Sequence, residues 1–382
     1  MKKIAILTNS VFTCGGEQRV VCIIANELSK LYEVTVYTED KSFDSNPYDL
    51  IDKISVKSFA PFSAGIITKG FRFLFKIPLF SFFRNFAFSW KITHFTKKLA
   101  TRLRDLLNGK YDTVIAVSDR LTLLLGYAKK YGLDVRTIMW EHNSFECYFR
   151  TKNHRCWKQD KLFIETSKYF DECVVLNEDY AEKYKKYLGI DCKVFYNPRS
   201  FVSKQKAELN NKTIISCCVL DIEPKGLDLL LDSFEIFAKK NPDWKLLIAG
   251  NGTDKSKLEH IVQQKGLGDR VEFLGYRSDV KELLLESSIF VLPSRWEGFP
   301  MSLTEAYECG LPVVVYDIPA TIPFRKNNDC IVCKSFDTKE YAEALLKLAE
   351  NFDLRKEIGT NATKFAASIS KESIIKKWLE IV

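Results

Sequence analysis

Short apolar runs alternate with segments of helix length from one end of the chain to the other. In the first half, these runs predict strands at residues 4–8, 33–38, 113–117, 135–140, 172–176 and 193–196. In the second half, they predict strands at residues 213–219, 245–249, 271–274, 289–292 and 312–316. The strand interiors are near-continuous Val, Ile and Leu, as expected where helices cover both faces of a sheet. The pattern therefore predicts an α/β fold with two parallel sheets and crossover helices.

Two domains are predicted from the length and from a turn signal near the middle. The 382 residues exceed the size at which one hydrophobic core usually keeps growing. The turn signal is Asn197-Pro198, followed by a polar segment. We therefore expect domains at residues 1–197 and 198–369. The remaining segment, 370–382, carries apolar residues at helical spacing, which predicts a helix that docks an apolar stripe.

The positive charge is concentrated in one part of the first domain. The formal net charge is +8, and residues 53–104 hold eleven Lys or Arg and no Asp or Glu. The rest of the chain therefore has a net charge near −3 (8 minus 11). This distribution argues against nucleic acid as a partner and favours local contact of residues 53–104 with an anionic surface. Residues 59–95 also contain eleven Phe. Two interpretations stay open: residues 59–104 lie on an anionic membrane, or these Phe pack the outer helices of the first domain.

The N-terminus and the cysteines favour a protein that stays in the cytoplasm. The apolar run after Met1 ends at Thr8, too early for a signal peptide. Eleven cysteines are scattered through a long chain, so we expect reduced thiols. Cys330 and Cys333 have redox or metal spacing, but no second pair or nearby His accompanies them. This favours two packed thiols and predicts no metal site.

The candidate sites follow strands, because ligands of open parallel sheets bind outside the carboxyl ends of the strands. After the first strand, Gly15 and Gly16 let the backbone approach a ligand, and the next helix start favours an anion. An ordinary turn is the alternative. After a later strand, Glu141-His142 interrupts an apolar run. His142 is either a functional imidazole that Glu141 orients or a structural histidine hydrogen-bonded in its loop.

Two further candidates lie in the second domain. Lys225, next to a glycine and just before an amphipathic helix, is the candidate for binding phosphate as a point charge, although an exposed turn lysine is common. Glu297 follows a buried strand and can accept hydrogen bonds from sugar hydroxyls. After it, backbone amides at a helix start point toward a diphosphate, over residues Gly298, Phe299, Pro300 and Met301.

Glu305 lies about one turn into the helix that follows and can reach a ribose diol. A second interpretation is structural, because Ser302-x-x-Glu305 is also a capping-box pattern that would use both side chains at the helix start. For Glu297 the alternative is a solvated loop carboxylate, which explains less well the Gly-Phe-Pro turn that follows it.

These residues give the chain a recognisable likeness. It resembles the retaining glycosyltransferases of family 4, which have the GT-B fold of two Rossmann-like parallel-sheet domains facing an interdomain cleft. The strongest element is the E-x7-E motif from Glu297 to Glu305, with its E-G-F-P turn and the T-E-A-Y-E-C-G-L-P-V-V segment. The likeness spans nearly the whole chain. It implies that the first domain binds the acceptor, that the second binds the nucleotide sugar, and that helix 370–382 returns to the first domain.

The resemblance also implies a role for each candidate residue. Glu297 would bind the transferred sugar and Glu305 the ribose, while His142 would lie beside the reacting sugar. Lys225 and the Gly16 backbone would contact the diphosphate. Arg277, in the segment Phe273-Leu274-Gly275-Tyr276-Arg277, would lie near a uracil-like base.

One position departs from the family pattern. The family usually has an Arg about five residues before the Lys, and this chain has Leu220 there, with Val219 before it. Either another cation, such as Arg295 or Arg199, neutralises the diphosphate, or activity is reduced or lost.

The resulting expectation is a metal-independent, cofactor-free hexosyltransferase. It would move a hexose or N-acetylhexosamine from a UDP-sugar, with retention, to a lipid-linked glycan of a surface polysaccharide, at the inner face of the cytoplasmic membrane. Two alternatives stay open: a catalytically silent nucleotide-sugar-binding subunit, and an epimerase or phosphorylase of the same fold. A dehydrogenase is disfavoured because no G-x-G-x-x-G follows the first strand.

Overall fold

The chain divides into two compact units in a computed structural model. The structure describes residues 1–41, 46–59, 73–74, 77, 80, 97–152 and 156–382. The first unit comprises Met1–Pro198 together with Lys371–Val382, and the second comprises Arg199–Ser370. The first unit is therefore built from two separate stretches of the chain.

The first unit is organised around a parallel sheet. In the described part of this unit, seven strands lie in the order β3-β2-β1-β4-β5-β6-β7. They are β1 (Lys3–Thr8), β2 (Glu33–Thr38), β3 (Ser55–Ser58), β4 (Thr113–Val117), β5 (Arg136–Trp140), β6 (Glu172–Val175) and β7 (Lys193–Val194). The strand order reverses between β1 and β4, whose register pairs Ile4 with Thr113.

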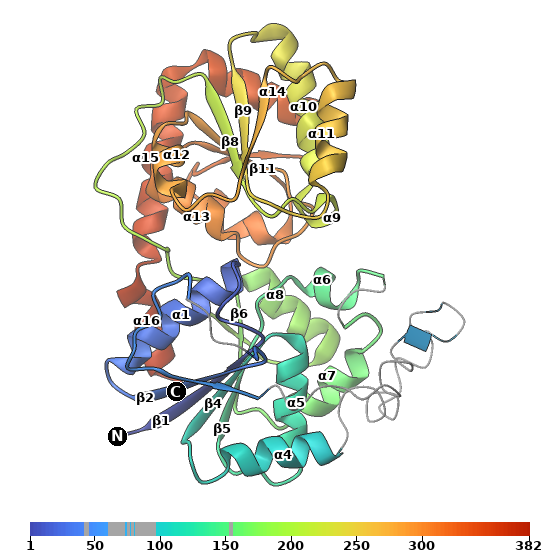
Figure 1. Ribbon diagram of the computed structural model, residues 1–382, viewed down its shortest axis with the longest axis vertical. Helices are drawn as coiled ribbons and strands as arrows, with labels where there is room; N and C mark the ends of the chain where they lie inside the picture. Colours follow the sequence, from blue (N-terminus) through green and yellow to red (C-terminus); the bar gives the residue numbers. More distant parts are fainter. Residues whose placement is uncertain (42–45, 60–72, 75–76, 78–79, 81–96, 153–155) are drawn as a thin grey trace. The chain divides into compact units, whose positions relative to one another are not determined.

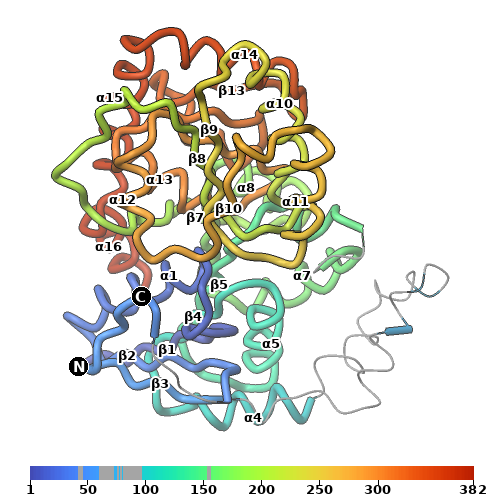
Figure 2. The backbone as a smooth tube through the Cα atoms, turned by 45° about the horizontal axis from the view of Figure 1, so that its top comes forward, coloured from blue at the N-terminus to red at the C-terminus, as the bar shows by residue number. Residues whose placement is uncertain are grey.

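Helices cover both faces of this sheet (Figure 1). The helical segments described are α1 (Gly16–Ser29), α4 (Lys97–Leu107), α5 (Asp119–Lys130), α6 (Phe145–Phe149), α7 (Asp160–Ser167), α8 (Glu178–Lys183), the π-helical η3 (Tyr184–Leu188) and α16 (Lys371–Leu379). Figures 1 and 2 both show the C-terminal α16 beside α1, although the two are far apart in sequence.

Aromatic packing anchors α16 in the first unit. The Trp378 ring lies edge-on to Trp140, with 4.6 Å between ring centroids, and to Phe195 at 5.4 Å. Trp378 is almost fully buried. Beyond the end of α16, Lys2 Nζ donates a hydrogen bond to the Val382 backbone oxygen over 2.8 Å. Trp378 thus contributes a buried ring to the core of the first unit.

The second unit repeats the architecture with a sheet of order β10-β9-β8-β11-β12-β13. The strands are β8 (Thr213–Cys217), β9 (Lys245–Ala249), β10 (Val271–Gly275), β11 (Ile289–Leu292), β12 (Val313–Tyr316) and β13 (Ile331–Cys333). The helices are α9 (Ile222–Lys225), α10 (Leu227–Lys240), α11 (Lys255–Gln264), α12 (Val280–Leu285), α13 (Met301–Glu308), the 3-10 helix η4 (Pro319–Arg325), α14 (Thr338–Glu350) and α15 (Phe352–Ser368). The strand order reverses between β8 and β11.

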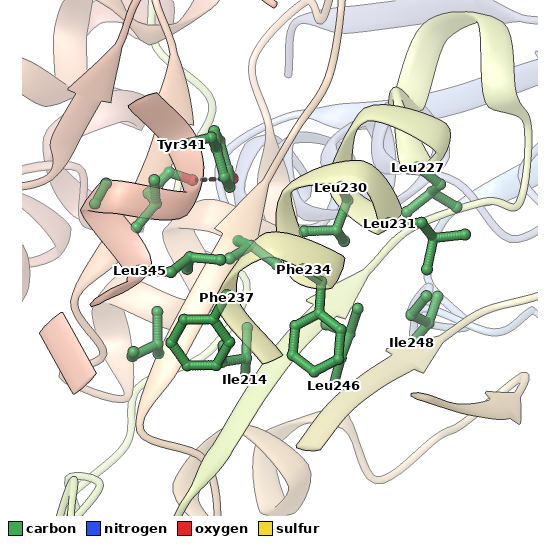
Figure 3. Packing of buried hydrophobic residues seen from close by; sticks show 14 of the residues in the cluster. Ile214, Leu227, Leu230, Leu231, Phe234, Phe237, Leu246, Ile248, Tyr341 and Leu345 are labelled. Atoms are coloured by element: carbon green, nitrogen blue, oxygen red, sulfur yellow. Dashed lines mark hydrogen bonds between the residues drawn. The ribbon is translucent and has the colours of Figure 1, made fainter. Parts of the chain in front are cut away.

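Figure 3 shows how the core of the second unit forms. Helix α10 presents apolar residues at positions three, four, seven and ten after the first, which places them on one face. These residues are Leu227, Leu230, Leu231, Phe234 and Phe237, and each is fully buried. Full burial of each side chain stabilises the fold by roughly 2 kcal/mol. This packing fixes α10 on the sheet and with it the turn before the helix, where Lys225 lies.

The observed architecture confirms the predicted α/β fold with two parallel sheets and crossover helices. Along the described residues, no helix is long and apolar enough to cross a bilayer. The basic aromatic stretch, residues 59–104, lies mostly outside the described residues. Its described end is α4, which buries Ala100, Leu103 and Leu107.

Candidate functional site

The reversal of strand order in the second sheet brings Lys225 and Glu297 together. Lys225 ends the short helix α9 that follows β8, and Glu297 lies in the loop between β11 and α13. The strands β8 and β11 are neighbours, paired through Ile289 and Ile214. Crevices at such reversals are where open parallel sheets bind ligands. The residues predicted to bind phosphate and sugar are therefore adjacent, at the reversal of strand order.

Close backbone packing fixes these two loops against each other. Gly226 has φ +61, and a Cβ atom on it would lie 2.2 Å from the Pro293 carbonyl oxygen. Only glycine combines this conformation with such a close approach at little cost. The Arg295 N–H also donates to the Pro224 carbonyl over 2.8 Å. The turn that carries Lys225 is thus fastened to the loop that carries Glu297.

Glu297 is held from two sides. Lys225 Nζ donates to Glu297 Oε1 over 2.6 Å, and the Ser294 hydroxyl donates to the same oxygen over 2.7 Å. The side chains of Lys225 and Glu297 are 22% and 12% exposed. Burial alone would lower the pKa of Lys225, but the Glu297 carboxylate outweighs it and raises the pKa above its ordinary value. The arrangement is a half-buried cation next to an oriented carboxylate.

Arg295 and Arg199, which could replace the family Arg, each form an ion pair with a carboxylate. The Arg295 guanidinium binds both oxygens of Asp228, over 2.9 and 2.7 Å. Arg199 Nη1 donates to Glu308 Oε2 over 2.8 Å.

Where the family has its Arg, the structure places only apolar side chains. Leu220 is fully buried in the core of the second unit, and Val219 is 53% exposed. Lys225, five residues further on, is a cation that pairs with Glu297.

The loop after Glu297 runs into the start of α13. As in any helix, the first amides of α13 have no intrahelical acceptor, so they can bind an anion. Pro300 has no N–H and serves as the N-cap residue. The Phe299 ring packs on Phe324, with 4.9 Å between ring centroids. Gly298 and Met301 complete this segment, and both are buried.

The capping-box interpretation of Glu305 is wrong. The helix begins at Met301, directly after Pro300, and no side-chain cap hydrogen bond is present at its start. Ser302 is therefore the second residue of the helix and not its cap. Glu305 lies in the middle of α13 and is buried.

Arg277 lies in the loop after β10. Its guanidinium pairs with Asp279, with Nε 2.7 Å from Oδ1 and a second contact from Nη2 to Oδ2. This hydrogen-bonded pair raises the pKa of Arg277. Strands β10 and β8 are separated by β9 in the sheet, so Arg277 lies further along the same edge than Lys225.

In the first unit, the glycine pair follows β1, at the reversal of strand order. Gly15 is extended, and its N–H donates to the Tyr48 hydroxyl over 2.5 Å. Gly16 begins α1. Directly after it, Glu17 accepts a hydrogen bond from the hydroxyl of Ser118, which follows β4 and has φ +62. A buried non-glycine residue in this conformation is a frequent mark of a functional site.

His142 and Glu141 lie just beyond the end of β5. Glu141 Oε2 accepts from the Asp119 N–H over 3.1 Å, and burial raises the pKa of Glu141 to about 8. Burial lowers the pKa of His142 to about 3, so its imidazole is neutral. The imidazole packs against Trp140 in a tilted arrangement, with 4.2 Å between ring centroids. Among the described residues, His142 Nε2 is buried with no hydrogen-bond partner.

Sequence reasoning missed several residues that shape these sites: Ser294, Asp228, Glu17 and Ser118. Ser294 was detectable in principle, because it lies only three residues before Glu297 in the same loop. The contact between Glu17 and Ser118 joins residues 101 positions apart, and a single sequence gives no signal for it.

Comparison with known proteins shows a family to which the second unit is similar. Residues 200–365 match the family model "Glycosyl transferases group 1". An uncharacterized glycosyltransferase of Haemophilus influenzae is 29% identical over 392 residues, covering 100% of both chains. The poly(ribitol-phosphate) alpha-N-acetylglucosaminyltransferase of Staphylococcus aureus is 27% identical over 230 residues, covering 59% of this chain and 46% of that protein.

Solved structures of the same fold cover the whole chain. TarM of S. aureus aligns with a TM-score of 0.77 at 16% identity, over 100% of this chain and 98% of TarM. HepE of Anabaena, in complex with UDP and glucose, aligns with a TM-score of 0.73 at 17% identity, over 100% and 99% of the two chains. The architecture of both units is therefore the GT-B fold.

Proposed function

From the premise that residues 200–365 form a glycosyltransferase group 1 domain, we propose that this glycosyltransferase moves a hexose or N-acetylhexosamine from a UDP-sugar to a lipid-linked glycan, with retention. The observation that carries the proposal is the Lys225–Glu297 pair, at the reversal of strand order in the second sheet. It combines an anion-binding cation with a carboxylate suited to sugar hydroxyls.

Charge stabilisation is the main contribution expected from the second unit. Departure of a nucleoside diphosphate leaves negative charge that must be stabilised. A lysine ammonium has three donors, so Lys225 can keep Glu297 and also reach a phosphate oxygen. The start of α13 adds backbone amides and the positive end of the helix dipole. In this proposal no metal is required.

The other candidate residues take the roles that the family resemblance implies. Glu297 holds the transferred sugar, Glu305 holds the ribose, and Arg277 lies near the base. His142 lies beside the reacting sugar as a neutral imidazole, because its pKa is about 3. A neutral imidazole can donate through one nitrogen and accept through the other, which suits hydrogen bonding to a sugar hydroxyl.

The acceptor is proposed from the chemistry of the relatives. One is the N,N'-diacetylbacillosaminyl-diphospho-undecaprenol alpha-1,3-N-acetylgalactosaminyltransferase of Campylobacter jejuni, 27% identical over 242 residues. Another is the UDP-Gal:alpha-D-GlcNAc-diphosphoundecaprenol alpha-1,3-galactosyltransferase of Escherichia coli, 37% identical over 97 residues. Both names specify a polyprenyl-linked acceptor. For this chain we propose such an acceptor at the cytoplasmic face of the membrane, with residues 59–104 contacting anionic lipid.

The test is transfer by the purified chain from a panel of UDP-sugars to diphosphoundecaprenol-linked acceptors, with the product anomer assigned by NMR. Replacing Glu297 by Gln should lower kcat/KM by about a hundredfold or more, a loss typical of removing a preorganised transition-state contact. The matched control is Glu259→Gln, which removes an exposed carboxylate on α11 and should leave turnover unchanged. Equal activity of the Glu297→Gln variant and wild type would refute the proposal.

A silent nucleotide-sugar-binding subunit is the second candidate, favoured by the apolar Val219 and Leu220 where the family has its Arg. Calorimetry separates the two, because a silent subunit binds the UDP-sugar but shows no turnover with any acceptor. Product formed from the donor alone would instead indicate an epimerase, and phosphate-dependent sugar release a phosphorylase.

A further inference from the structure

Two cysteines that are distant in sequence lie in contact at the edge of the first sheet. Cys173 is in β6, and Cys192 directly precedes β7, 19 positions later. Their Sγ atoms are 2.9 Å apart. Cys173 is buried, while Cys192 is partly exposed.

The strand register explains this contact. Strands β6 and β7 pair in parallel, with Val174 opposite Lys193 and Val175 opposite Val194. One residue earlier, the same register places Cys173 opposite Cys192, so both side chains leave the same face. Neighbouring strands are about 4.8 Å apart, which lies within the range of Cα separations that a disulfide spans.

We propose that Cys173 and Cys192 are a modification site, at which a small-molecule disulfide oxidises the two thiols to an intramolecular disulfide. A reducing compartment keeps the thiols reduced, so the bond responds to oxidation and is not a permanent crosslink. The pair was not detectable in the sequence, where only Cys330 and Cys333 have redox spacing.

The reaction is two steps of thiol–disulfide exchange. The Cys192 thiol, the more exposed of the two, loses its proton and attacks glutathione disulfide, forming a mixed disulfide and releasing one glutathione thiolate. Cys173 then loses its proton and attacks Cys192 Sγ, forming the internal bond and releasing the second glutathione. The protein loses two protons and two electrons, and one glutathione disulfide becomes two glutathione thiols.

The bond would fasten the edge of the first sheet. Strand β7 has only two residues and is the last strand in the sheet order, so few ladder hydrogen bonds hold it. The loop that closes contains α8 and η3. Helix α8 contacts α6, the helix that follows His142, through the ion pair between Lys183 and Glu146. Oxidation would therefore stiffen the segment that supports the His142 loop.

The test uses the full chain in a Cys14→Ser background, because Cys14 is exposed and would react with glutathione disulfide itself. After oxidation and alkylation, non-reducing peptide mapping should show the Cys173 peptide joined to the Cys192 peptide. The thiol count in denaturant should fall by two. The midpoint of thermal unfolding of the oxidised protein should rise by roughly 5 °C or more, as expected for closing a loop of this length.

Single variants make the result decisive. Cys173→Ser and Cys192→Ser should each abolish both the joined peptide and the thermal shift. Cys330→Ser is the matched control and should leave both unchanged, because the Cys330 thiol contacts the Phe324 carbonyl instead of a second thiol. If Cys173→Ser fails to fold, Cys192→Ser alone decides, since that position is partly exposed. An oxidised protein without the joined peptide would overturn the proposal.

Discussion

A double-mutant cycle on Lys225 and Glu297 measures how strongly the candidate site is coupled. The perturbations are Lys225→Met, Glu297→Gln and the double variant. The pair is short, at 2.6 Å, and its side chains are only 22% and 12% exposed. A hydrogen bond between charged groups in such surroundings is worth about 2 kcal/mol, which lies between the values for a fully buried ion pair and for a solvent-exposed one. We therefore expect a coupling of about 2 kcal/mol in the free energy of unfolding.

The assay is urea unfolding followed by a probe of the second unit, with the coupling taken from the four variants of the cycle. The reference cycle uses Lys255 and Glu259 on α11, which are 3.7 Å apart and 42% and 48% exposed. An exposed helical pair of this kind is worth about 0.3–0.5 kcal/mol. Added UDP should rescue Glu297→Gln more than wild type, because the anion takes the place of the lost partner of Lys225. Equal coupling in the two cycles would refute the description of the site as a half-buried ion pair.

Three further predictions concern backbone, packing and pH. Position 226 has φ +61, and a new Cβ there would lie 2.2 Å from the Pro293 carbonyl oxygen. The Gly226→Ala substitution should therefore destabilise the second unit by more than about 1 kcal/mol and weaken UDP binding in calorimetry. Trp378→Ala should cost the first unit about 3–5 kcal/mol in urea unfolding, because it leaves a cavity against Trp140. Because the pKa of His142 falls from 6.5 to about 3 on folding, stability should drop as pH falls below about 6.5, where only the unfolded chain takes the proton. The pKa of Glu141 is raised to about 8, which has the opposite effect, because the protein then loses stability as pH rises from 4.5 through 8. Removal of the imidazole in the His142→Asn variant should therefore make the free energy of unfolding fall less steeply at acid pH than in wild type. Parallel pH profiles of variant and wild type would contradict this assignment.

The apolar pattern predicted the interior strands of both sheets but missed the strands β3 and β13. Strands such as β4, with all five residues buried, carry a continuous apolar signal. In contrast, β3 is the short polar segment Ser55–Ser58 at the edge of its sheet and is mostly exposed. An edge strand of this kind is ordered by main-chain pairing with its neighbour, which leaves no mark in its own side chains.

The position of the candidate site was predictable, whereas its internal contacts were not. Strand ends and the glycine-rich turns identify Lys225 and Glu297 as residues of the carboxyl edge of one sheet. Their adjacency depends on the strand order, in which β8 and β11 are neighbours. The close approach of Gly226 to Pro293 is a fact of packing between distant segments, and no periodicity reports it.

The first unit is completed by a stretch of the chain that is synthesised after the whole second unit. Lys371–Val382 belong to that unit, yet all of Arg199–Ser370 precedes them on the ribosome. During translation, Trp140 and Phe195 therefore lack their contacts with the Trp378 ring until the second unit has been synthesised. The second unit is continuous in sequence and faces no such delay. Nascent chains should thus acquire protease resistance in the C-terminal half first, and the N-terminal half should depend longer on chaperones.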